Sequence, residues 1–229
     1  MLKLIRLEWK KNNIAKYVRN AFIMVIVLLM LILAVAGELE ADETVLEQGN
    51  SMLKSGVELF TNMSFIVFTS TMLAAFIVNS YKNKTINLMF SYPISRKKIL
   101  LSQMLSVWIF NFIALVLSKV LLYAVLVITK EYMLITARDI ALGSGMFYIE
   151  IFINSAVMVS ISFIALLIGL KMKSSKATII TGVIIVCLTQ GNIGSYTLLG
   201  NIPFYALLLI ISAVSVFLTL YKLETRDVL

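Results

Sequence analysis

Long apolar stretches, separated by short charged segments, constrain the fold of this chain more than any other feature of its sequence. About 20 mainly apolar helical residues cross the hydrocarbon core of a bilayer. Hydrophobic residues make up 60% of the 229 positions and charged residues 14%, whereas a soluble domain carries about 25% charged residues. We therefore expect an all-α, polytopic membrane protein that forms a single transmembrane domain with six transmembrane helices. The expected spans are residues 17–36, 59–80, 99–128, 146–170, 177–190 and 202–221.

Lysine and arginine residues are distributed unevenly between the two sets of loops that these spans define. Sixteen lie in the N-terminal segment, in the loops after the second and fourth spans and in the C-terminal tail, whereas three lie in the opposite loops. Because basic loops remain in the cytoplasm, we expect both termini inside, in a multi-pass protein of the cell membrane of a bacterium. The net charge of +8 then belongs to segments beside the lipid, and no nucleic acid partner is expected.

The residue types that are missing from the sequence exclude several kinds of chemistry. The chain has no histidine and a single cysteine, Cys187, so it cannot assemble an internal disulfide, the usual thiolate or histidine metal sites, or a serine–histidine catalytic pair. It also lacks a glycine-rich phosphate-binding loop ending in Gly-Lys-Ser or Gly-Lys-Thr. We expect no enzyme activity and no bound cofactor in this chain, so ATP-driven transport would need a separate ATPase.

The N-terminal segment, residues 1–16, has the pattern of an amphipathic helix that lies along the inner membrane surface. Leu2, Ile5 and Trp9 share one helical face, whereas basic residues share another. The alternative is a basic flank that only determines the topology. We expect this segment to be retained, because it lacks the features of a cleaved signal peptide.

The loop after the second span, residues 81–98, contains more apolar residues than a simple cytosolic turn needs. A short helix here would offer apolar and basic side chains to a groove on a soluble partner. Pro93 would end such a helix, because the residue before a proline avoids the helical conformation, and Ser95 would cap the next one. The alternative is an interfacial loop that contacts only lipid. The apolar residues of this loop are Ile86, Leu88, Met89, Phe90 and Tyr92.

The last outer loop, residues 190–201, is uncharged and contains three glycines. Such a segment can enter the membrane as a re-entrant loop only where protein or a water-filled cavity satisfies its backbone polar groups. The preceding span, 177–190, is short without this loop, which favours re-entry. The alternative is a short exposed turn.

Polar residues interrupt the apolar surface of the third span. Asn111 and Ser118 share one helical face, and Lys119 is adjacent to Ser118. A charge at the bilayer centre costs roughly 2.5–3.5 kcal/mol on insertion scales, and we expect no carboxylate in the middle of the membrane to match Lys119. Either the lysine side chain extends to the interface, so that its ammonium group reaches water, or it serves a substrate pathway or a contact between helices.

Small residues recur every seven positions in the fourth span, at Ser155, Ser162 and Gly169, with Met158 in the row beside them. Small residues allow close approach of helices, so we interpret this row as a packing seam. The alternative is a flexible, methionine-lined surface that contacts varied substrates. The candidate pathway or packing residues are therefore Asn111, Ser118, Lys119, Ser155, Met158 and Ser162.

The order of these parts resembles that of ABC-2 type transporter permeases over almost the whole chain. The shared features are a basic N-terminal helix, two spans, a distinctive loop, four more spans and a short charged tail. The most specific stretch is residues 81–105, YKNKTINLMFSYPISRKKILLSQML, in which Thr85, Pro93, Ser95 and Arg96 match the family pattern. Two positions depart from it, with a serine for the usual acidic residue and a glutamine for the usual lysine, namely Ser80 and Gln103.

This resemblance implies a half-transporter that pairs with a second permease, identical or homologous, and with two ABC ATPase subunits on the cytoplasmic side. The loop 81–98 would contain the coupling helix that docks into the ATPase, and the N-terminal helix would contact the ATPase as well. ATP and Mg would be bound by the ATPase. Compact members of the family often serve peptide export or immunity against antimicrobial peptides. The implied coupling residues are Thr85, Leu88, Met89, Phe90, Tyr92, Pro93, Ser95 and Arg96.

Three classes of function are therefore open. The first is a permease subunit of an ATP-driven exporter for an amphipathic or hydrophobic substrate, such as a peptide, drug or lipid. The second is a channel or secondary transporter that works alone in the membrane. The third is a membrane enzyme, for which the sequence offers no catalytic group of residues. Co-purification with a soluble ATPase would favour the first class, and ion-driven uptake by the chain alone would favour the second.

Overall fold

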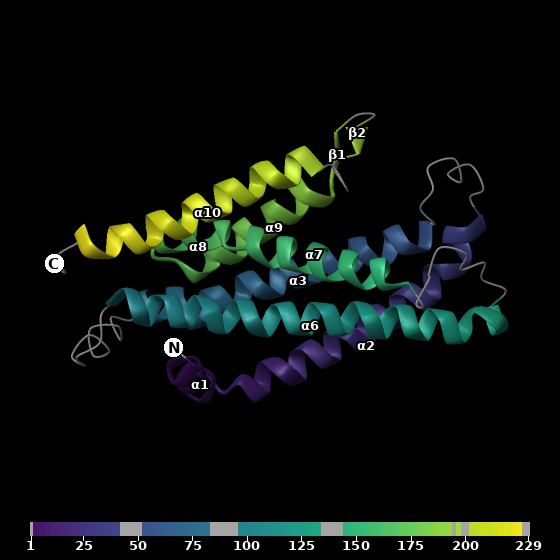
Figure 1. The fold of residues 1–229 in the computed structure, drawn as a ribbon, viewed down its shortest axis with the longest axis horizontal. Coiled ribbons are helices and arrows are strands. Elements are labelled where there is room, and N and C mark those ends of the chain that lie inside the picture. The colour runs from purple at the N-terminus through teal and green to yellow at the C-terminus, as the bar shows by residue number, and fades with distance from the viewer. Residues whose placement is uncertain are drawn as a thin grey trace. The chain divides into compact units, whose positions relative to one another are not determined.

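The computed structural model describes residues 2–41, 52–82, 96–133, 144–193, 196–197 and 202–225. These residues are almost entirely helical, which confirms the all-α class (Figure 1). The exception is a short antiparallel ladder in which Asn192 pairs with Thr197 and Ile193 with Tyr196. The elements are α1 Leu2–Lys11, α2 Ile14–Ala41, α3 Met52–Leu73, η2 Ala74–Val78, α4 Asn79–Lys82, α6 Arg96–Met133, α7 Gly145–Ile161, α8 Ile164–Lys171, α9 Ser175–Gln190, β1 Asn192–Ile193, β2 Tyr196–Thr197 and α10 Ile202–Thr225.

Five helical segments among the described residues are long and apolar enough to cross a membrane, and they correspond to five of the six expected spans. The remaining expected span, 177–190, corresponds to α9, which has 16 residues. A helix of that length is about 24 Å long, which is shorter than the roughly 30 Å of the hydrocarbon core. The sixth crossing therefore stays a prediction. The five segments are Ile14–Val35, Lys54–Lys82, Lys97–Thr129, Gly145–Lys171 and Ile202–Tyr221.

A turn at Asn12 and Asn13 separates the N-terminal helix from the first span. The Asn12 side chain donates a hydrogen bond from Nδ2 to the Glu8 carbonyl oxygen at 3.0 Å, at the end of α1. Asn13 has a φ of 50°, a left-handed conformation that asparagine tolerates better than most residues. The first span therefore begins at Ile14, three residues before the sequence-based boundary.

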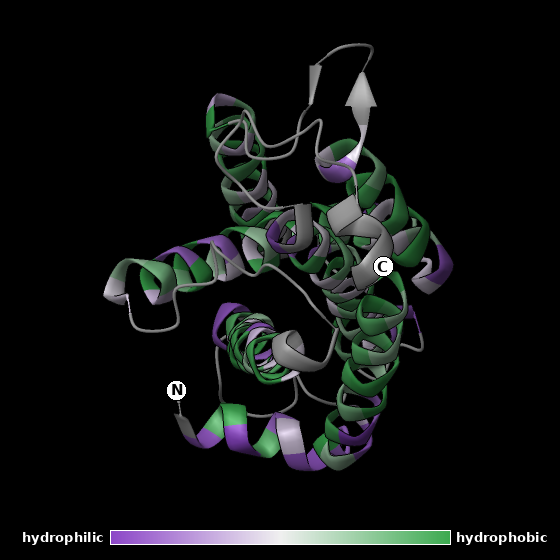
Figure 2. Ribbon diagram, turned by 90° about the vertical axis from the view of Figure 1, so that its right-hand side faces the viewer, coloured by the Kyte–Doolittle hydropathy of each residue, from purple (hydrophilic) through white to green (hydrophobic). Residues whose placement is uncertain are grey.

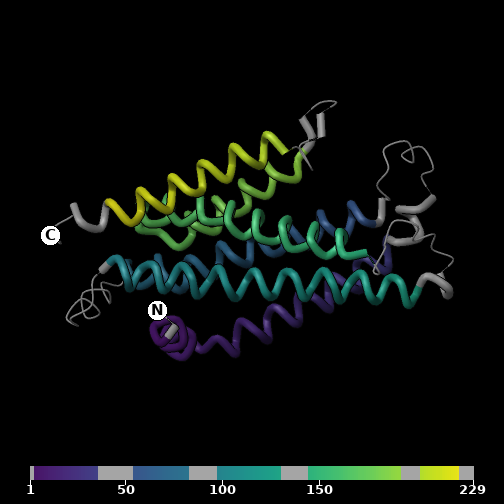
Figure 3. The backbone as a smooth tube through the Cα atoms, in the orientation of Figure 1, coloured from purple at the N-terminus to yellow at the C-terminus, as the bar shows by residue number. Residues whose placement is uncertain are grey.

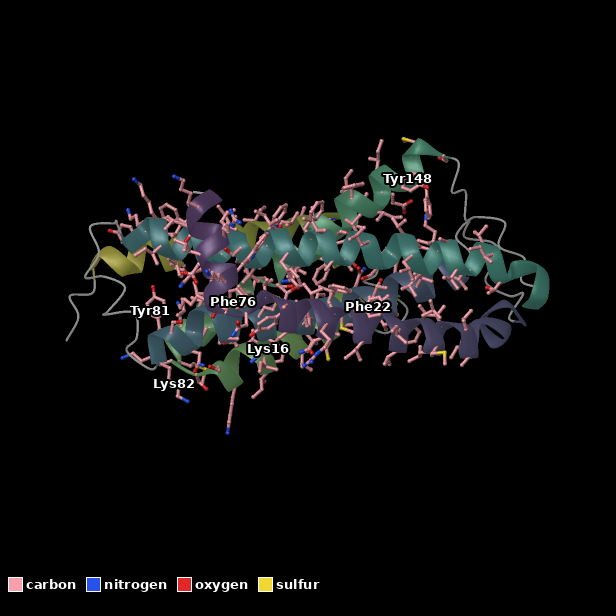
Figure 4. All side chains as sticks on the ribbon, turned by 90° about the horizontal axis from the view of Figure 1, so that it is seen from below. Lys16, Phe22, Phe76, Tyr81, Lys82 and Tyr148 are labelled. Carbon is pink, nitrogen blue, oxygen red and sulfur yellow. The ribbon has the colours of Figure 1, made fainter. Side chains whose placement is uncertain are left out.

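The second expected span begins earlier than its sequence pattern suggested. α3 starts at Met52 rather than at residue 59, so Glu58 lies within the helix and not in the outer loop. The α-helix continues to Leu73, and a π-helical turn follows before α4 ends at Lys82. Such π turns occur mostly as single insertions in α-helices, often at functional sites. Tyr81 and Lys82 lie at the end of this segment (Figure 4).

The fourth expected span, 146–170, is interrupted by a short turn. α7 ends at Ile161 and α8 begins at Ile164. The Ser162 hydroxyl donates to the Met158 carbonyl oxygen at 3.0 Å, and serine side chains that bond back to the preceding turn often bend helices. After α8, Lys173 has a φ of 49°, and the Ser174 hydroxyl accepts a hydrogen bond from the Ala177 amide, which caps α9.

The chain divides into two compact units, and α3, α6 and α7 contribute residues to both. The first unit comprises residues 1–14, 65–112 and 156–229. Within it, α8 packs against α9 and α10, and η2 packs against α8 and α9. In Figures 1 and 3, α8, α9 and α10 lie beside one another and are coloured from green to yellow. The approach of α8 to α9 is close, because a Cβ atom at Gly169 would collide with the Thr178 hydroxyl.

The second unit comprises residues 15–64 and 113–155. In α2, one face carries large apolar side chains that the protein does not cover, such as Phe22, which is 62% exposed. Exposed apolar faces of this extent are typical of helices that lie against lipid rather than water. Figure 2 shows apolar residues along most of the helical surface, with hydrophilic residues mainly in α1 and at helix ends. Other exposed apolar residues of the second unit include Val18, Ile23, Ile26, Val27, Met30, Ile113, Leu117 and Ile128.

Candidate functional site

The N-terminal helix α1 is attached to the first turns of α6 in the first unit. The Trp9 indole donates a hydrogen bond from Nε1 to the Ser106 carbonyl oxygen at 3.2 Å. Ile5, on the face of α1 that the sequence assigned to lipid, is 6% exposed. That face is therefore covered in part by protein. The position of α1 on the inner membrane surface stays a prediction, and the Leu2 side chain lies outside the described part of the chain.

Glu8 makes a second connection between α1 and α6. Its carboxylate is almost fully buried and accepts a hydrogen bond from Gln103 Nε2 at 3.3 Å. The other carboxylate oxygen accepts from Asn12 Nδ2 at 3.3 Å and lies 3.7 Å from Lys11 Nζ. A buried carboxylate needs such partners, because removing it from water is costly. The sequence pattern did not reveal this contact, since Glu8 and Gln103 are 95 positions apart.

The expected coupling segment, 81–98, lies largely outside the described residues. Arg96 is the first residue of α6, and its side chain is not described. Gln103 and Ser106, which follow this segment on α6, contact α1. The other expected coupling residues, all outside the described ranges, are Thr85, Leu88, Met89, Phe90, Tyr92, Pro93 and Ser95.

Asn111, a candidate pathway residue, is fully buried in the first unit. Its Nδ2 atom donates to the Val107 carbonyl oxygen at 2.8 Å and lies 3.3 Å from the Met72 sulfur. Its Oδ1 atom is buried, with no hydrogen-bond partner among the described residues. Asn111 on α6 therefore contacts α3 through Met72, while its Oδ1 atom accepts no hydrogen bond from the described residues.

The described residues of the fourth-span seam are mostly buried. Met158 and Ser162 are buried, and Ser162 bonds to the backbone of its own helix. Met172, which lies fourteen positions after Met158 in the same seven-residue row, is 63% exposed. The assignment of this row to packing stays a prediction. The sequence pattern did not predict two hydrogen bonds to nearby Ser160. Trp108 Nε1 donates to Ser160 Oγ at 3.1 Å, and Ser212 Oγ donates to the Ser160 carbonyl oxygen.

Lys119 is fully buried in the second unit, so its ammonium group does not extend to the surface. The alternative in which the Lys119 side chain extends to the interface is therefore wrong. Its Nζ atom donates a hydrogen bond to Asn154 Oδ1 on α7 at 2.8 Å. Glu58 on α3 and Glu150 on α7 attract it electrostatically. Glu58 lies near the start of the candidate span Lys54–Lys82, because α3 begins before it. The expectation that no carboxylate in the middle of the membrane matches Lys119 stays a prediction.

A second ion pair lies beside this buried group. Lys54 Nζ is 2.8 Å from Glu150 Oε2, and the Lys54 side chain is 13% exposed while that of Glu150 is 51% exposed. Ser118 and Ser155 are both buried, and Ser118 donates to the Ala114 carbonyl oxygen of its own helix. In the second unit, charged and polar groups of α3, α6 and α7 therefore interact with one another. The sequence of each helix alone did not predict these interactions.

The fold is all-helical, its five long apolar helices are compatible with a multi-pass membrane protein, and charged and polar groups lie inside its helical segments. One related protein has a similar sequence. It is a Bacillus subtilis protein named uncharacterized protein YcbO, which is 29% identical over 201 residues, covering 82% of this chain and 82% of the relative. No protein-family model matches the chain. No solved structure matches it either.

Proposed function

We propose that this chain is the permease subunit of an ATP-driven exporter in the cell membrane, with both termini in the cytoplasm. With a second permease, identical or homologous, it would form the pathway for an amphipathic or hydrophobic substrate. Two separate ABC ATPase subunits would bind ATP and Mg and dock on the loop 81–98. Peptide export, including immunity against antimicrobial peptides, is one activity of this kind.

The observation that carries this proposal is the attachment of α1 to the start of α6. Gln103 lies inside the stretch 81–105 that resembles the permease pattern, and it bonds to the buried Glu8. The Trp9 contact with Ser106 lies one turn further along α6. A force applied to the loop 81–98 would reach α6 directly, and α1 would move with it. This is the arrangement that a coupling region needs.

Co-purification with an ATPase tests the proposal. We would co-express the tagged chain with the P-loop ATPase encoded nearest to it and measure vanadate-sensitive ATP hydrolysis of the purified complex in liposomes. We expect co-elution, and we expect Phe90→Ala and Tyr92→Ala to reduce hydrolysis sharply while membrane insertion stays normal. Asn83→Ala, in the same loop but outside the apolar cluster, is the matched control. Normal hydrolysis in both aromatic variants would rule out the coupling role.

A channel or secondary transporter that works alone is the second candidate. The buried Lys119 and the half-buried Glu58 favour it, because ionisable groups inside spans often mark ion or substrate pathways. Liposomes that contain the purified chain without any ATPase separate the two. Uptake driven by an ion gradient would support the second candidate, whereas transport only with ATPase and ATP would support the exporter.

A further inference from the structure

Polar residues of α3, α6 and α7 surround or adjoin Lys119 in the second unit, where Lys119 bonds to Asn154 and interacts electrostatically with Glu58. Glu58 and Asn62 lie one turn apart on α3, Lys119 and Tyr123 lie one turn apart on α6, and Asn154 and Ser155 are adjacent on α7. Positions four apart in a helix share a face. We call these residues the interhelical polar site.

Four oxygen atoms of this site are buried and have no hydrogen-bond partner among the described residues. Native proteins pair nearly all buried polar atoms, so each exception calls for an occupant or a function. Glu58 Oε1 and Asn62 Oδ1 can only accept hydrogen bonds from a partner when the carboxylate is ionised, whereas the hydroxyls can donate or accept. The site therefore needs hydrogen-bond donors on the side of α3. The four atoms are Glu58 Oε1, Asn62 Oδ1, Tyr123 OH and Ser155 Oγ.

The ammonium group of Lys119 has the opposite need. An ammonium group has three N–H donors, and one of them bonds to Asn154 Oδ1. Glu58 attracts Lys119 electrostatically, but the two side chains form no direct ion pair in the part of the chain that the structure describes. Two donors of Lys119 therefore have no hydrogen-bond partner in the described part of the chain.

The charges of the site constrain the net charge of its occupant. Lys54 and Glu150 already neutralise each other at 2.8 Å. With Glu58 ionised, Glu58 and Lys119 carry one charge of each sign, so that form of the site has no net charge. A lone cation would satisfy Glu58 and be repelled by Lys119, and a lone anion would meet the reverse problem. An occupant with both a donor-bearing cation and an anion satisfies both sides at once.

The surroundings of the site indicate that its occupant also has apolar chains. Exposure decreases from Glu150, which is half exposed, through Lys54 to the fully buried Lys119. On α7, the residues beside Glu150 on the exposed surface are apolar, including Ile149 and Ile153. A head group held at the site would leave its apolar chains along this surface, where lipid would otherwise lie.

We propose that the interhelical polar site binds the zwitterionic head of an amphiphile that carries a primary ammonium group beside an anionic group, as phosphatidylethanolamine does. The ammonium group would donate to Glu58 and Asn62, and the anionic group would accept from Lys119. Tyr123 and Ser155 would complete the hydrogen bonds. If the exporter proposal holds, this chemistry defines the polar end of the substrate, but binding itself requires no ATPase.

Lipid binding to the purified full chain tests this site independently of transport. Native mass spectrometry in detergent would compare phosphatidylethanolamine with phosphatidylcholine of identical acyl chains, whose quaternary ammonium has no N–H donor. We expect phosphatidylethanolamine to bind at least about tenfold more tightly, because the missing donors would leave buried acceptors unpaired. Glycerophosphoethanolamine, which lacks acyl chains, would show by competition whether a soluble head group suffices or a lipid is required.

Variants assign the preference to the site. We expect Glu58→Gln and Lys119→Gln each to reduce the preference for phosphatidylethanolamine about tenfold or more, and Lys98→Gln, an exposed position on the same helix, to leave it unchanged. The double variant Glu58→Gln/Lys119→Gln contains no unpaired charge and should fold and insert, yet it should bind both lipids equally. Equal binding of both lipids by the wild-type chain would overturn the proposal, and so would an unchanged preference in the double variant. Either result would mean that ordered water fills the site.

Discussion

Two glycines of the first unit show how closely its helices approach. A Cβ atom at Gly182 would lie 2.6 Å from the Cβ atom of Ser70, and one at Gly169 would meet the Thr178 side chain and lie 3.2 Å from Val78 Cγ2. Small residues at such positions let backbones come together where no hydrophobic driving force between helices exists. Gly169 was recognised from its seven-residue spacing, but its contact partner on α9 could not be.

Gly169→Ala tests this close packing. The added methyl group would displace Thr178, so we expect the free energy of unfolding to fall by about 1–3 kcal/mol, as for other overpacked cores. Unfolding of the purified protein by sodium dodecyl sulfate in mixed micelles measures the change. Gly145→Ala is the control, because nothing lies within 4 Å of the Cβ position there. Equal stability of the two variants would contradict the close approach of α8 and α9.

The buried polar residues follow the same logic at the residue scale. Their types and positions are visible in the sequence, but their partners are not. Trp108 stacks on Phe112, with ring centroids 5.1 Å apart, and also donates to Ser160. No spacing in the sequence connects positions 108 and 160, so the hydrogen bond depends on how α6 and α7 are aligned.

A double-mutant cycle on Trp108→Phe and Ser160→Ala measures this contact. The phenylalanine keeps an aromatic ring beside Phe112 but removes the N–H donor and part of the indole, and the cycle subtracts the lost packing because that loss is present in both Trp108→Phe variants. We expect a coupling free energy of about 0.5–1.5 kcal/mol, the usual net contribution of a hydrogen bond, from unfolding in mixed micelles. Strictly additive effects of the two substitutions would show that the indole and the hydroxyl do not interact.

At the scale of elements, α1 is the helix whose attachment matters most for the proposed coupling. Its amphipathic pattern predicted a helix, and the structure confirms that helix over Leu2–Lys11. Its buried acidic residue, Glu8, was not predicted to have a role, because a single carboxylate among basic residues resembles an ordinary surface charge. Only the approach of Gln103 from α6 makes it a structural residue.

Glu8→Ala should release α1 from α6. The substitution leaves the buried Gln103 amide without its acceptor, and hydrogen bonds to charged groups contribute about 1.5–3 kcal/mol. Hydrogen–deuterium exchange should therefore become at least about tenfold faster in residues 2–11. Lys3→Ala, an exposed position on the same helix, should leave exchange unchanged. Unaltered protection of α1 in Glu8→Ala would show that Glu8 does not hold the helix in place.

At the scale of the whole molecule, α9 determines the number of membrane crossings. It is the shortest apolar helix among those compared with the membrane thickness. Lys171 and Lys173 precede it, and Lys176 lies in its first turn. If α9 crosses, both termini lie on the same side. If it does not, they lie on opposite sides, and the charge distribution loses its meaning as a topology signal.

Cysteine labelling decides between these topologies. In a Cys187→Ser background, Lys173→Cys and Gly191→Cys place single thiols at the two ends of α9. We expect a membrane-impermeant maleimide added to intact cells to label Gly191→Cys, and to label Lys173→Cys only after the membrane is opened. Cys187→Ser without a new cysteine should stay unlabelled. Labelling of both thiols from the same side would exclude the sixth crossing.

The sequence by itself determined that this chain is helical and that its helices are apolar enough to cross a membrane. It also located five of these candidate spans, with end positions that differ by at most five residues from those in the structure. That information is local, because in lipid each helix satisfies its own backbone hydrogen bonds and its apolar length alone decides whether it can span. The pattern did not reveal the breaks after α1 and at Ser162, where the side chains of Asn12 and Ser162 bond to the backbone. It also did not reveal the early start of α3. Only the tertiary structure decided that Glu8 meets Gln103 and that Glu58, Lys119 and Asn154 share one site. These contacts depend on how helices far apart in the chain are aligned along one another, and the hydropathy of the sequence does not determine that alignment.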